Sequence, residues 1–349
     1  MPYLIFFLAT LVFSFIITFL IRKLALRLSI VDVPGSSDRK IHQTPIPLLG
    51  GLAIFISFFC ALGALVYFYP SNIFGDFIAL SKLFWIFLGG VFLVIGGYLD
   101  DKYNLKPRYQ IIWALLAAAA ISLSDIGISH VRNPFGGVIR FDLFKFGFLT
   151  LPQDLFTFFW LLIMMYTTKL LDGLDGLVSG IVGIGSLIIF FVALRPFVHQ
   201  FDTAYLAIGL AGVFLGFLIW NFHPAKIFLG ESGSLLAGYF LGILAIISGS
   251  KVAAALLIMG VPILDLIWII LRRVFFEKKS FAEGDSKHLH FRLLGAGFSH
   301  RGAVLFLYAI TAAFGLTTLF FQTQQKAVIL VLVVLVMIGL GGWLTKSKS

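Results

Sequence analysis

Long apolar stretches separated by short polar segments run through the whole chain. Eleven of them approach the roughly 20 residues that a helix needs to cross a lipid bilayer. They lie near residues 3–21, 49–69, 83–99, 109–124, 154–171, 177–194, 203–220, 234–249, 252–271, 302–321 and 327–344. Backbone polar groups inside a bilayer must be satisfied within the segment itself, which favours helices. We therefore expect an all-α polytopic membrane protein, a single domain over residues 1–349 with about eleven transmembrane helices.

Composition narrows the class of protein. Hydrophobic residues make up 60% of the chain and charged residues 12%, whereas soluble domains carry roughly 25% charged residues. The net charge of +10 would also suit nucleic acid, but we interpret it as a topology signal and expect no nucleic acid partner. Cys60 is the single cysteine, which excludes an intrachain disulfide. The first apolar stretch lacks the basic start and cleavage site of a signal peptide, so we expect it to be a retained span.

Lysine and arginine residues predict the orientation, because they concentrate on the cytoplasmic side of a membrane. With the N-terminus outside, 19 of the 26 fall in segments that face the cytoplasm. This asymmetry predicts an N-terminus outside and a C-terminus inside. In the external residues 125–152, Gly136 and Gly137 precede alternating apolar and polar positions. That pattern predicts a short extracytoplasmic β-hairpin.

An acidic turn, Asp172-Gly173-Leu174-Asp175-Gly176, separates two of the predicted spans on the cytoplasmic side. Acidic groups at the edge of a membrane segment are candidates for a functional site. Asp-Gly pairs also occur in ordinary solvated turns. The segment alone leaves both interpretations open.

A second acidic motif, Asp100-Asp101, ends the third apolar stretch and precedes Lys102. Adjacent carboxylates raise each other's proton affinity unless a cation or base chemistry uses them. The alternative is an ordinary acidic pair at a helix end, balanced by nearby lysines.

The segment from Asn221 to Ser234 places an amide, Lys226 and Glu231 directly before a predicted helix. The free N–H groups and the dipole at the start of a helix favour an anion such as a diphosphate. Serine capping is the alternative, but it does not account for Lys226 and Glu231 together.

Two further cytoplasmic loops carry basic groups. The longest one holds Arg272, His288, His290 and Arg292. Its histidines could ligate a metal, but zinc needs three or four ligands and the loop has no cysteine. We favour imidazole and guanidinium groups beside a diphosphate.

The N-terminal loop contains Arg39, Lys40 and His42 between prolines. Such a basic cluster would attract an anionic lipid head group. All five motif-bearing loops fall on one side of the membrane, which predicts an active site facing the cytoplasm.

Taken together, these motifs resemble the polyprenyl-phosphate N-acetylhexosamine-1-phosphate transferase family over most of the chain. The sequence is most similar to the bacterial undecaprenyl-phosphate N-acetylglucosamine-1-phosphate transferases, and less similar to the phospho-N-acetylmuramoyl-pentapeptide transferases. The residues that carry the resemblance are Asp32, Pro34, Arg39, Lys40, His42, Pro45, Pro47, Gly50, Gly51, Asp100, Asp101, Leu105, the turn 172–176, Asn221, the segment 224–228, Gly230, Gly233, Ser234, Asp265, Arg272, Arg273, Asp285, His288, His290 and Arg292.

The resemblance implies a reaction at the cytoplasmic membrane of a bacterium. A sugar 1-phosphate would move from a UDP-N-acetylhexosamine to undecaprenyl phosphate, releasing UMP and initiating cell-envelope glycan synthesis. The cofactor would be Mg²⁺, with Mn²⁺ as an alternative, and related proteins suggest a homodimer. An anionic acceptor attacks an anionic diphosphate in such a reaction, so catalysis is positioning and charge neutralisation.

The resemblance also implies roles for individual residues. Asp100 and Asp101 would act near the acceptor phosphate, and Glu231 would hold the metal, with the two aspartates as further candidate ligands. Asp175 and Asn221 would help to hold the uridine. The remaining candidates for substrate binding or catalysis are Arg39, Lys40, His42, Lys169, Asp172, Lys226, Arg272, His288, His290 and Arg292.

Four positions depart from the family pattern. Tyr166 and Lys169 stand where asparagines are usual, Glu231 replaces an aspartate, and Phe291 replaces a histidine. We expect Lys169 and Glu231 to face each other. In one version the ammonium takes over part of the metal's neutralising role. In the version we favour, Glu231 still binds Mg²⁺ and Lys169 binds phosphate.

Other functions stay open at this point. A different UDP-sugar, such as a UDP-N-acetylmuramoyl peptide or a diacetamido sugar, would leave the same motifs. A transporter would also carry charges in its spans, and Asp265 is the main candidate for one, but the charges here cluster at one face. A catalytically silent homologue is the third alternative.

Overall fold

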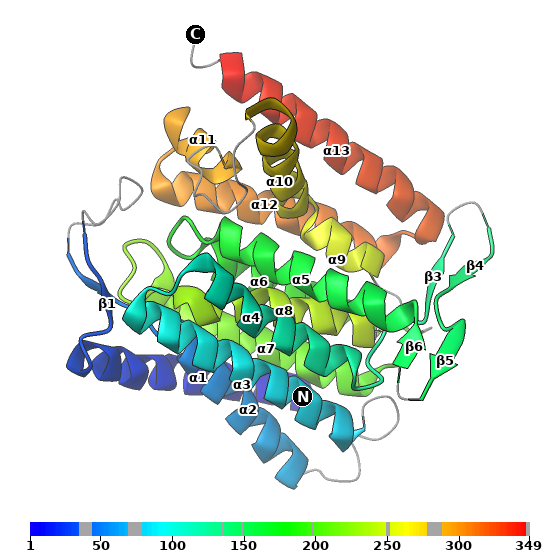
Figure 1. The fold of residues 1–349 in the computed structure, drawn as a ribbon, viewed down its shortest axis with the longest axis horizontal. Coiled ribbons are helices and arrows are strands. Elements are labelled where there is room, and N and C mark those ends of the chain that lie inside the picture. The colour runs from blue at the N-terminus through cyan, green and yellow to red at the C-terminus, as the bar shows by residue number, and fades with distance from the viewer. Residues whose placement is uncertain are drawn as a thin grey trace.

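The structure is a computed structural model that describes residues 1–34, 44–68, 79–133, 136–147, 149–196, 198–248, 252–277 and 288–346. It is mostly helical (Figure 1). The helices are α1 (Pro2–Arg27), α2 (Gly50–Phe68), α3 (Leu80–Tyr103), α4 (Pro107–Ser122), α5 (Gln153–Leu171), α6 (Leu177–Ala193), α7 (Phe201–Asn221), α8 (Gly230–Ile247), α9 (Val252–Ile258), α10 (Gly260–Leu271), the π-helical turn η1 (Arg272–Glu277), α11 (Leu289–Gly295), α12 (His300–Phe320) and α13 (Thr323–Lys346). The strands are β1 (Val31–Asp32), β2 (Ile46–Pro47), β3 (His130–Arg132), β4 (Val138–Arg140), β5 (Phe144–Phe146) and β6 (Leu149–Leu151).

The predicted multi-pass helical architecture is confirmed, and every predicted apolar stretch falls on a helix or on the α9–α10 pair. In the described part of the chain, seven helices are long and apolar enough to cross a membrane: α1, α2, α3, α5, α7, α8 and α12. The number rises to eight if α9 and α10 count as one broken span. This is fewer than the eleven expected. Helices α4 and α6 have only 16 and 17 residues, the apolar part of α13 counts only from Gln324 to Leu340, and the stretch 252–271 is not straight.

The break in the stretch 252–271 lies at Met259, where α9 and α10 meet at a bend of 77°. Pro262 occupies the first turn of α10. Proline has no N–H to donate and fits best at the start of a helix. Hydropathy alone does not reveal such a bend, since the residues on both sides are equally apolar.

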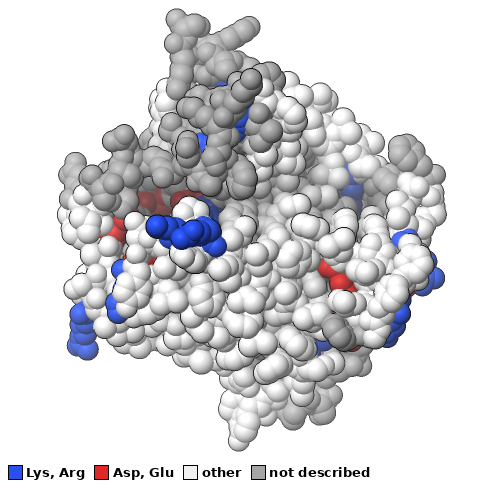
Figure 2. All heavy atoms as spheres, viewed as in Figure 1, with Lys and Arg blue, Asp and Glu red and all other residues white. Residues whose placement is uncertain are grey.

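Burial increases from the outer helices to the centre of the bundle. Every residue of α8 from Ser232 to Ile246 is buried, whereas α1 exposes large apolar side chains such as Leu4, Ile5 and Leu8. Figure 2 shows charged residues toward the ends of the molecule and a broad, mostly uncharged surface between them. Such a surface suits the hydrocarbon of a bilayer.

Small residues let the central helices approach closely. A Cβ at Gly97 of α3 would lie 2.3 Å from the backbone nitrogen of Ser232, and one at Gly51 of α2 would lie 2.3 Å from the backbone nitrogen of Gly233. On α7, a Cβ at Gly216 would lie 2.3 Å from the carbonyl oxygen of Leu11. Helices in lipid rely on such close packing, since lipid provides no hydrophobic force between them. The start of α8 is therefore enclosed by α2 and α3.

Three two-stranded sheets complete the fold. β3 pairs with β4 and β5 with β6, both antiparallel. Gly136 and Gly137 have φ of +115° and +78° at the turn of the first hairpin, so the predicted hairpin is confirmed, while the second one was missed. β1 pairs with β2, and Figure 1 shows this pair at the end of the bundle opposite β3 to β6.

The contact between α3 and α8 generates a test of the fold. Gly97→Ala places a methyl group against the backbone of Ser232, and we expect the overpacking to cost about 1–3 kcal/mol of unfolding free energy. Gly63→Ala in α2 is the matched control, because nothing lies within 4 Å of its Cβ position. That control is expected to be neutral or slightly stabilising. Thermal unfolding in detergent measures both, and equal unfolding temperatures for the two variants would contradict the packing described.

Candidate functional site

The last turn of α3 and the first turn of α8 bring two acidic residues together. The backbone N–H of Glu231 donates to Asp101 Oδ1 at 3.0 Å, which satisfies one of the free N–H groups at the start of α8. Gly230 has φ +69°, and a Cβ there would lie 2.5 Å from Asp101 Oδ2. Glycine at this position is therefore needed for Asp101 to reach the helix start. Asp101 Oδ2 is buried and has no hydrogen-bond partner among the described residues.

Asp100 is held by the segment that follows α3. Its Oδ1 accepts hydrogen bonds from the backbone N–H of Leu105 at 2.8 Å and from Gln110 Nε2 at 2.9 Å. Asn104 has φ +51°, a left-handed conformation that ends the helix. Asp100 thus stabilises the turn that follows α3 and orients an amide on α4.

Lys169, in the last turn of α5, completes this network. Its ammonium contacts Glu231 Oε1 and donates to Gln110 Oε1 at 3.0 Å. The predicted contact between Lys169 and Glu231 is confirmed. Gln110 was not a candidate, and no sequence signal distinguishes it from other polar residues near a helix start. We call Asp100, Asp101, Gln110, Lys169 and Glu231 the carboxylate network.

The acidic turn lies beside the carboxylate network. The side chain of Asp172 keeps exposed surface although protein surrounds it on most sides. Desolvation by the surrounding protein is the larger cause, and the negative charges of Glu231 and Asp175 follow. Together they raise the pKa of Asp172 to about 7. A Cβ at Gly173 would lie 2.2 Å from His290 Nε2, so the turn also contacts α11.

Asp175 belongs to a second cluster with two histidines. Asp175 Oδ2 lies 2.7 Å from His223 Nδ1 and accepts the backbone N–H of Ala225 at 3.1 Å. His300 Nε2 accepts the backbone N–H of Asp175 at 2.9 Å, and the two imidazole rings stack with centroids 4.0 Å apart. His300 was missed by the sequence analysis. Its position just after Ser299, at the start of a predicted apolar span, is the signal that could have found it.

Asp175, His223 and His300 form the one group of three potential metal ligands among the described residues, with ligand atoms within 4.8 Å of one another. Zinc ligands converge tetrahedrally on the ion. The two stacked rings have roughly parallel planes, so their in-plane lone pairs do not converge well on one point. Its hydrogen bonds join the acidic turn to His300 of α12 and to His223 and Ala225 after α7, and we interpret it as a positioning cluster for that turn.

Asn221 uses both ends of its amide within the protein. Its Oδ1 accepts from Ser179 Oγ at 2.7 Å, and its Nδ2 donates to the carbonyl of Ile227 at 3.0 Å. These bonds hold the turn after α7. The same turn directs Lys226 to Trp220, with its ammonium 5.4 Å from the ring centroid, and not into the carboxylate network.

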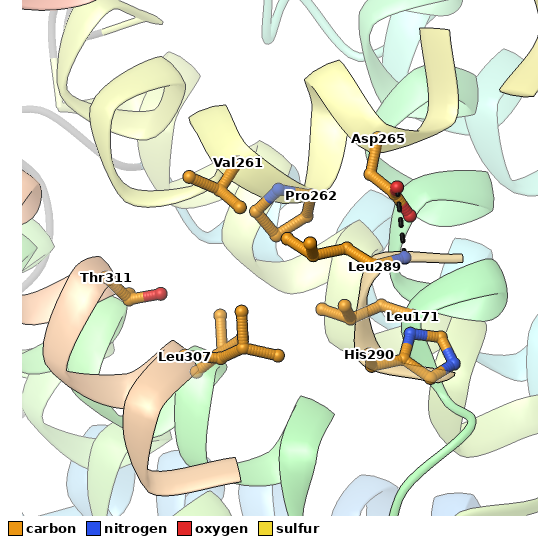
Figure 3. A pocket seen from close by; sticks show the side chains of 9 residues that line it. Leu171, Val261, Pro262, Asp265, Leu289, His290, Leu307 and Thr311 are labelled. Atoms are coloured by element: carbon orange, nitrogen blue, oxygen red, sulfur yellow. Dashed lines mark hydrogen bonds between the residues drawn. The ribbon is translucent and has the colours of Figure 1, made fainter. Parts of the chain in front are cut away.

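Asp265 of α10 binds the residues at the start of α11, and Figure 3 shows its bond to Leu289. Its Oδ2 lies 2.9 Å from His288 Nδ1, and its Oδ1 accepts the backbone N–H of Leu289 at 3.1 Å. The rings of His288 and His290 are nearly parallel, with centroids 5.5 Å apart. His290 lines a cavity about the size of one water molecule, with Leu171 and Pro262. Its burial, then the charges of His288 and His300, lower its pKa to about 3, so the imidazole is neutral.

The remaining predicted residues lie around this centre or outside the described ranges. Arg272 begins η1 directly after α10, and Arg292 lies on α11, partly buried. Arg39, Lys40 and His42 fall in residues 35–43, outside the described residues. The structure thus joins Asp101 and Lys169 to Glu231 directly and Asp100 to Lys169 through Gln110. The acidic turn, which includes Asp175, lies beside them and contacts His290.

Comparisons with known proteins agree with this arrangement. The family model described as glycosyl transferase family 4 matches residues 83–249, a range that contains the whole carboxylate network. The probable undecaprenyl-phosphate N-acetylglucosaminyl 1-phosphate transferase of Bacillus subtilis (strain 168) is 32% identical over 90% of this chain and 83% of its own length. The decaprenyl-phosphate N-acetylglucosaminephosphotransferase of Mycobacterium tuberculosis (strain ATCC 25618 / H37Rv) is 32% identical over 89% of this chain and 81% of its own length. The undecaprenyl-phosphate alpha-N-acetylglucosaminyl 1-phosphate transferase of Salmonella typhi is 27% identical over 93% and 86%.

The raised pKa of Asp172 gives a pH-dependent prediction for stability. Because its folded-state pKa of about 7 lies above the unfolded value of roughly 3.9, the wild-type protein loses stability from this group as pH rises between them. Asp172→Asn removes the penalty, so its gain in unfolding temperature over the wild type should be larger at pH 8 than at pH 5.

The control for this prediction is Asp142→Asn in the β3–β4 hairpin region. The guanidinium of Arg140 hydrogen-bonds Asp142 and lowers its pKa, so the sign is reversed and no gain is expected at pH 8. Scanning fluorimetry of the detergent-solubilised protein measures both variants. A gain for Asp172→Asn that is equal at the two pH values would show that this carboxyl titrates normally.

Proposed function

The chain belongs to glycosyl transferase family 4, and we propose that it transfers N-acetylglucosamine 1-phosphate from UDP-N-acetylglucosamine to a polyprenyl phosphate, such as undecaprenyl phosphate. The observation that carries this proposal is the carboxylate network around Lys169, within the range matched by the family model. Relatives named for this activity align with about nine-tenths of the chain. The product would be a diphosphate-linked lipid sugar and UMP.

The reaction is a displacement at phosphorus. An oxygen of the lipid phosphate forms a bond to the phosphorus that carries the sugar, and the bond from that phosphorus to the oxygen of UMP breaks. The electron pair leaves with UMP. Both reactants are anions, so the protein must align them and neutralise charge.

The described residues support these two tasks. Asp100 and Asp101 would orient the lipid phosphate by analogy with the family, and Asp101 Oδ2 has a free acceptor position. Lys169 supplies a positive charge beside them. Asp175 is fixed by His223 and His300 and would orient the uridine.

The residues also fit the divalent cation that the family resemblance implies. Mg²⁺ prefers oxygen ligands from carboxylates. Asp100, Asp101 and Glu231 lie in one network that contains a single ammonium, and the buried Asp101 Oδ2 has no described partner. Glu231 would hold the ion, and the ion would neutralise charge on the diphosphate. Asp100 and Asp101 would have to move closer to take part, because the three carboxylates do not gather their oxygens within 4.8 Å of one another.

The proposal includes an orientation in the membrane, with the N-terminus outside. The carboxylate network would then lie at the cytoplasmic face of a bacterial inner membrane, where a UDP-sugar is available. The two β-hairpins would lie on the opposite, external side. We extend the proposal to eleven spans, with α4, α6 and α13 as the additional ones, and to a homodimer. Asp265 does not support a transport path, since its carboxylate is engaged by His288 and Leu289.

UMP release by the purified protein, given undecaprenyl phosphate and UDP-N-acetylglucosamine, tests the proposal. We expect Asp101→Asn to lower the rate by at least about 100-fold, because it removes a charged group that orients the acceptor. The asparagine oxygen still accepts from Glu231, so the fold is retained. Asp142→Asn is the control. Asp142 pairs with Arg140 in the hairpin region, and neither residue belongs to the carboxylate network.

The wild type and Asp142→Asn should release UMP at the same rate. No release with this sugar would redirect the assay to UDP-N-acetylmuramoyl peptide and diacetamido sugars. Absence of release with every UDP-sugar, or an undiminished rate for Asp101→Asn, would overturn the proposal.

A further inference from the structure

We propose that the ammonium of Lys169 competes with a divalent cation for the carboxylate of Glu231, and so lowers the affinity of the site for the metal. The inference rests on the proposed function for the identity of the cation. It concerns a residue of this chain that stands where the family usually has an uncharged amide.

The ion pair is partly shielded from water. Lys169 contacts Glu231 Oε1, and their side chains are only 22% and 14% exposed. Ion pairs on an open surface contribute little because water screens them. Shielding makes each charge in this pair harder to separate from the other.

The ammonium is also held from a second side. Lys169 Nζ donates to Gln110 Oε1 at 3.0 Å. Gln110 Nε2 in turn donates to Asp100 Oδ1 at 2.9 Å and to the carbonyl of Leu105 at 3.1 Å. These bonds fix the amide so that its oxygen points to Lys169. The lysine is therefore positioned by the fold, and a metal would have to displace a prepared contact.

The ammonium of Lys169 and a divalent cation cannot both bind Glu231 Oε1 without affecting each other. A lysine ammonium has only donors and no acceptor, so it is not a ligand for a metal. Mg²⁺ requires its oxygens at about 2.0–2.1 Å, and a cation that close to Glu231 would be repelled by the ammonium. Binding of the metal must therefore move Lys169 away or use the other oxygen of Glu231 against that repulsion.

The competition has a consequence for the reaction. Lys169 is a single positive charge that neutralises part of the network at all times, but it does not bridge two phosphates as Mg²⁺ does. We therefore infer a site in which lysine supplies a permanent charge and the divalent cation binds weakly.

Binding of Mn²⁺ to the full-length protein in detergent, without substrate, tests the inference. Electron paramagnetic resonance reports free Mn²⁺ and does not depend on transfer activity. Lys169→Met and Lys169→Gln remove the charge, and each should bind Mn²⁺ at least tenfold more tightly than the wild type. Lys169→Arg keeps the charge and should stay weak.

The matched control is Lys82→Met. Lys82 lies in α3, 19 residues before Asp101, which is about 28 Å along a helix. It should bind Mn²⁺ as the wild type does. Glu231→Gln in the Lys169→Met background should lose the gained affinity, which shows that the ion sits on Glu231.

The outcomes separate this inference from the proposed function. Neutral variants that bind Mn²⁺ no more tightly than the wild type, with unfolding temperatures that show a folded protein, would overturn it. If Lys169→Met does not fold, Lys169→Gln and Lys169→Arg still give the comparison between neutral and charged side chains. A tenfold gain in a protein that releases no UMP would uphold the competition and reject the transferase, whereas UMP release without the gain would do the reverse.

Discussion

The junction between α3 and α8 is the constraint on which the rest of the site depends. Asp101 accepts one of the free N–H groups at the start of α8, that of Glu231, and this bond forms only because Gly97 and Gly230 let the two backbones approach. The same contact that closes the helix packing therefore places two acidic side chains side by side. In a membrane helix an unsatisfied N–H is costly, so the carboxylate stabilises the helix start while it forms part of the site.

The acidic turn, residues 172–176, connects the α3–α8 junction to several other helices. Asp172 interacts electrostatically with Glu231, Gly173 touches His290, and Asp175 is bound by His223 and His300. These partners come from α8, α11, α7 and α12 or the segments next to them. One turn of five residues thus connects elements that are distant in sequence, and a change in it would disturb all of them together.

The helical, multi-pass architecture could be predicted from the sequence, because apolar length is a local property; the orientation derived from the charge asymmetry stays a prediction. The helices and the partnership of Lys169 with Glu231 were predicted correctly. The bend at Met259 was not, since both of its sides are apolar. The position of His300 at the start of a helix is a local signal, but its pairing with Asp175 spans 125 positions, so nothing near His300 in the sequence identifies that partner. Gln110 was missed for a related reason. Its amide bridges Asp100 and Lys169, and Lys169 lies 59 positions away in the sequence.

The charge balance of the carboxylate network explains why a lysine in it affects more than metal affinity. Acidic groups gathered at the end of a helix bundle, partly away from water, repel one another and oppose folding unless a cation joins them. A diffusing cation stabilises the folded state only in proportion to its concentration relative to its dissociation constant. Lys169 is covalently part of α5, so its charge is present whenever the chain folds. A network of this composition assembles without ligand, and the divalent cation proposed for this site would find Glu231 already paired with Lys169.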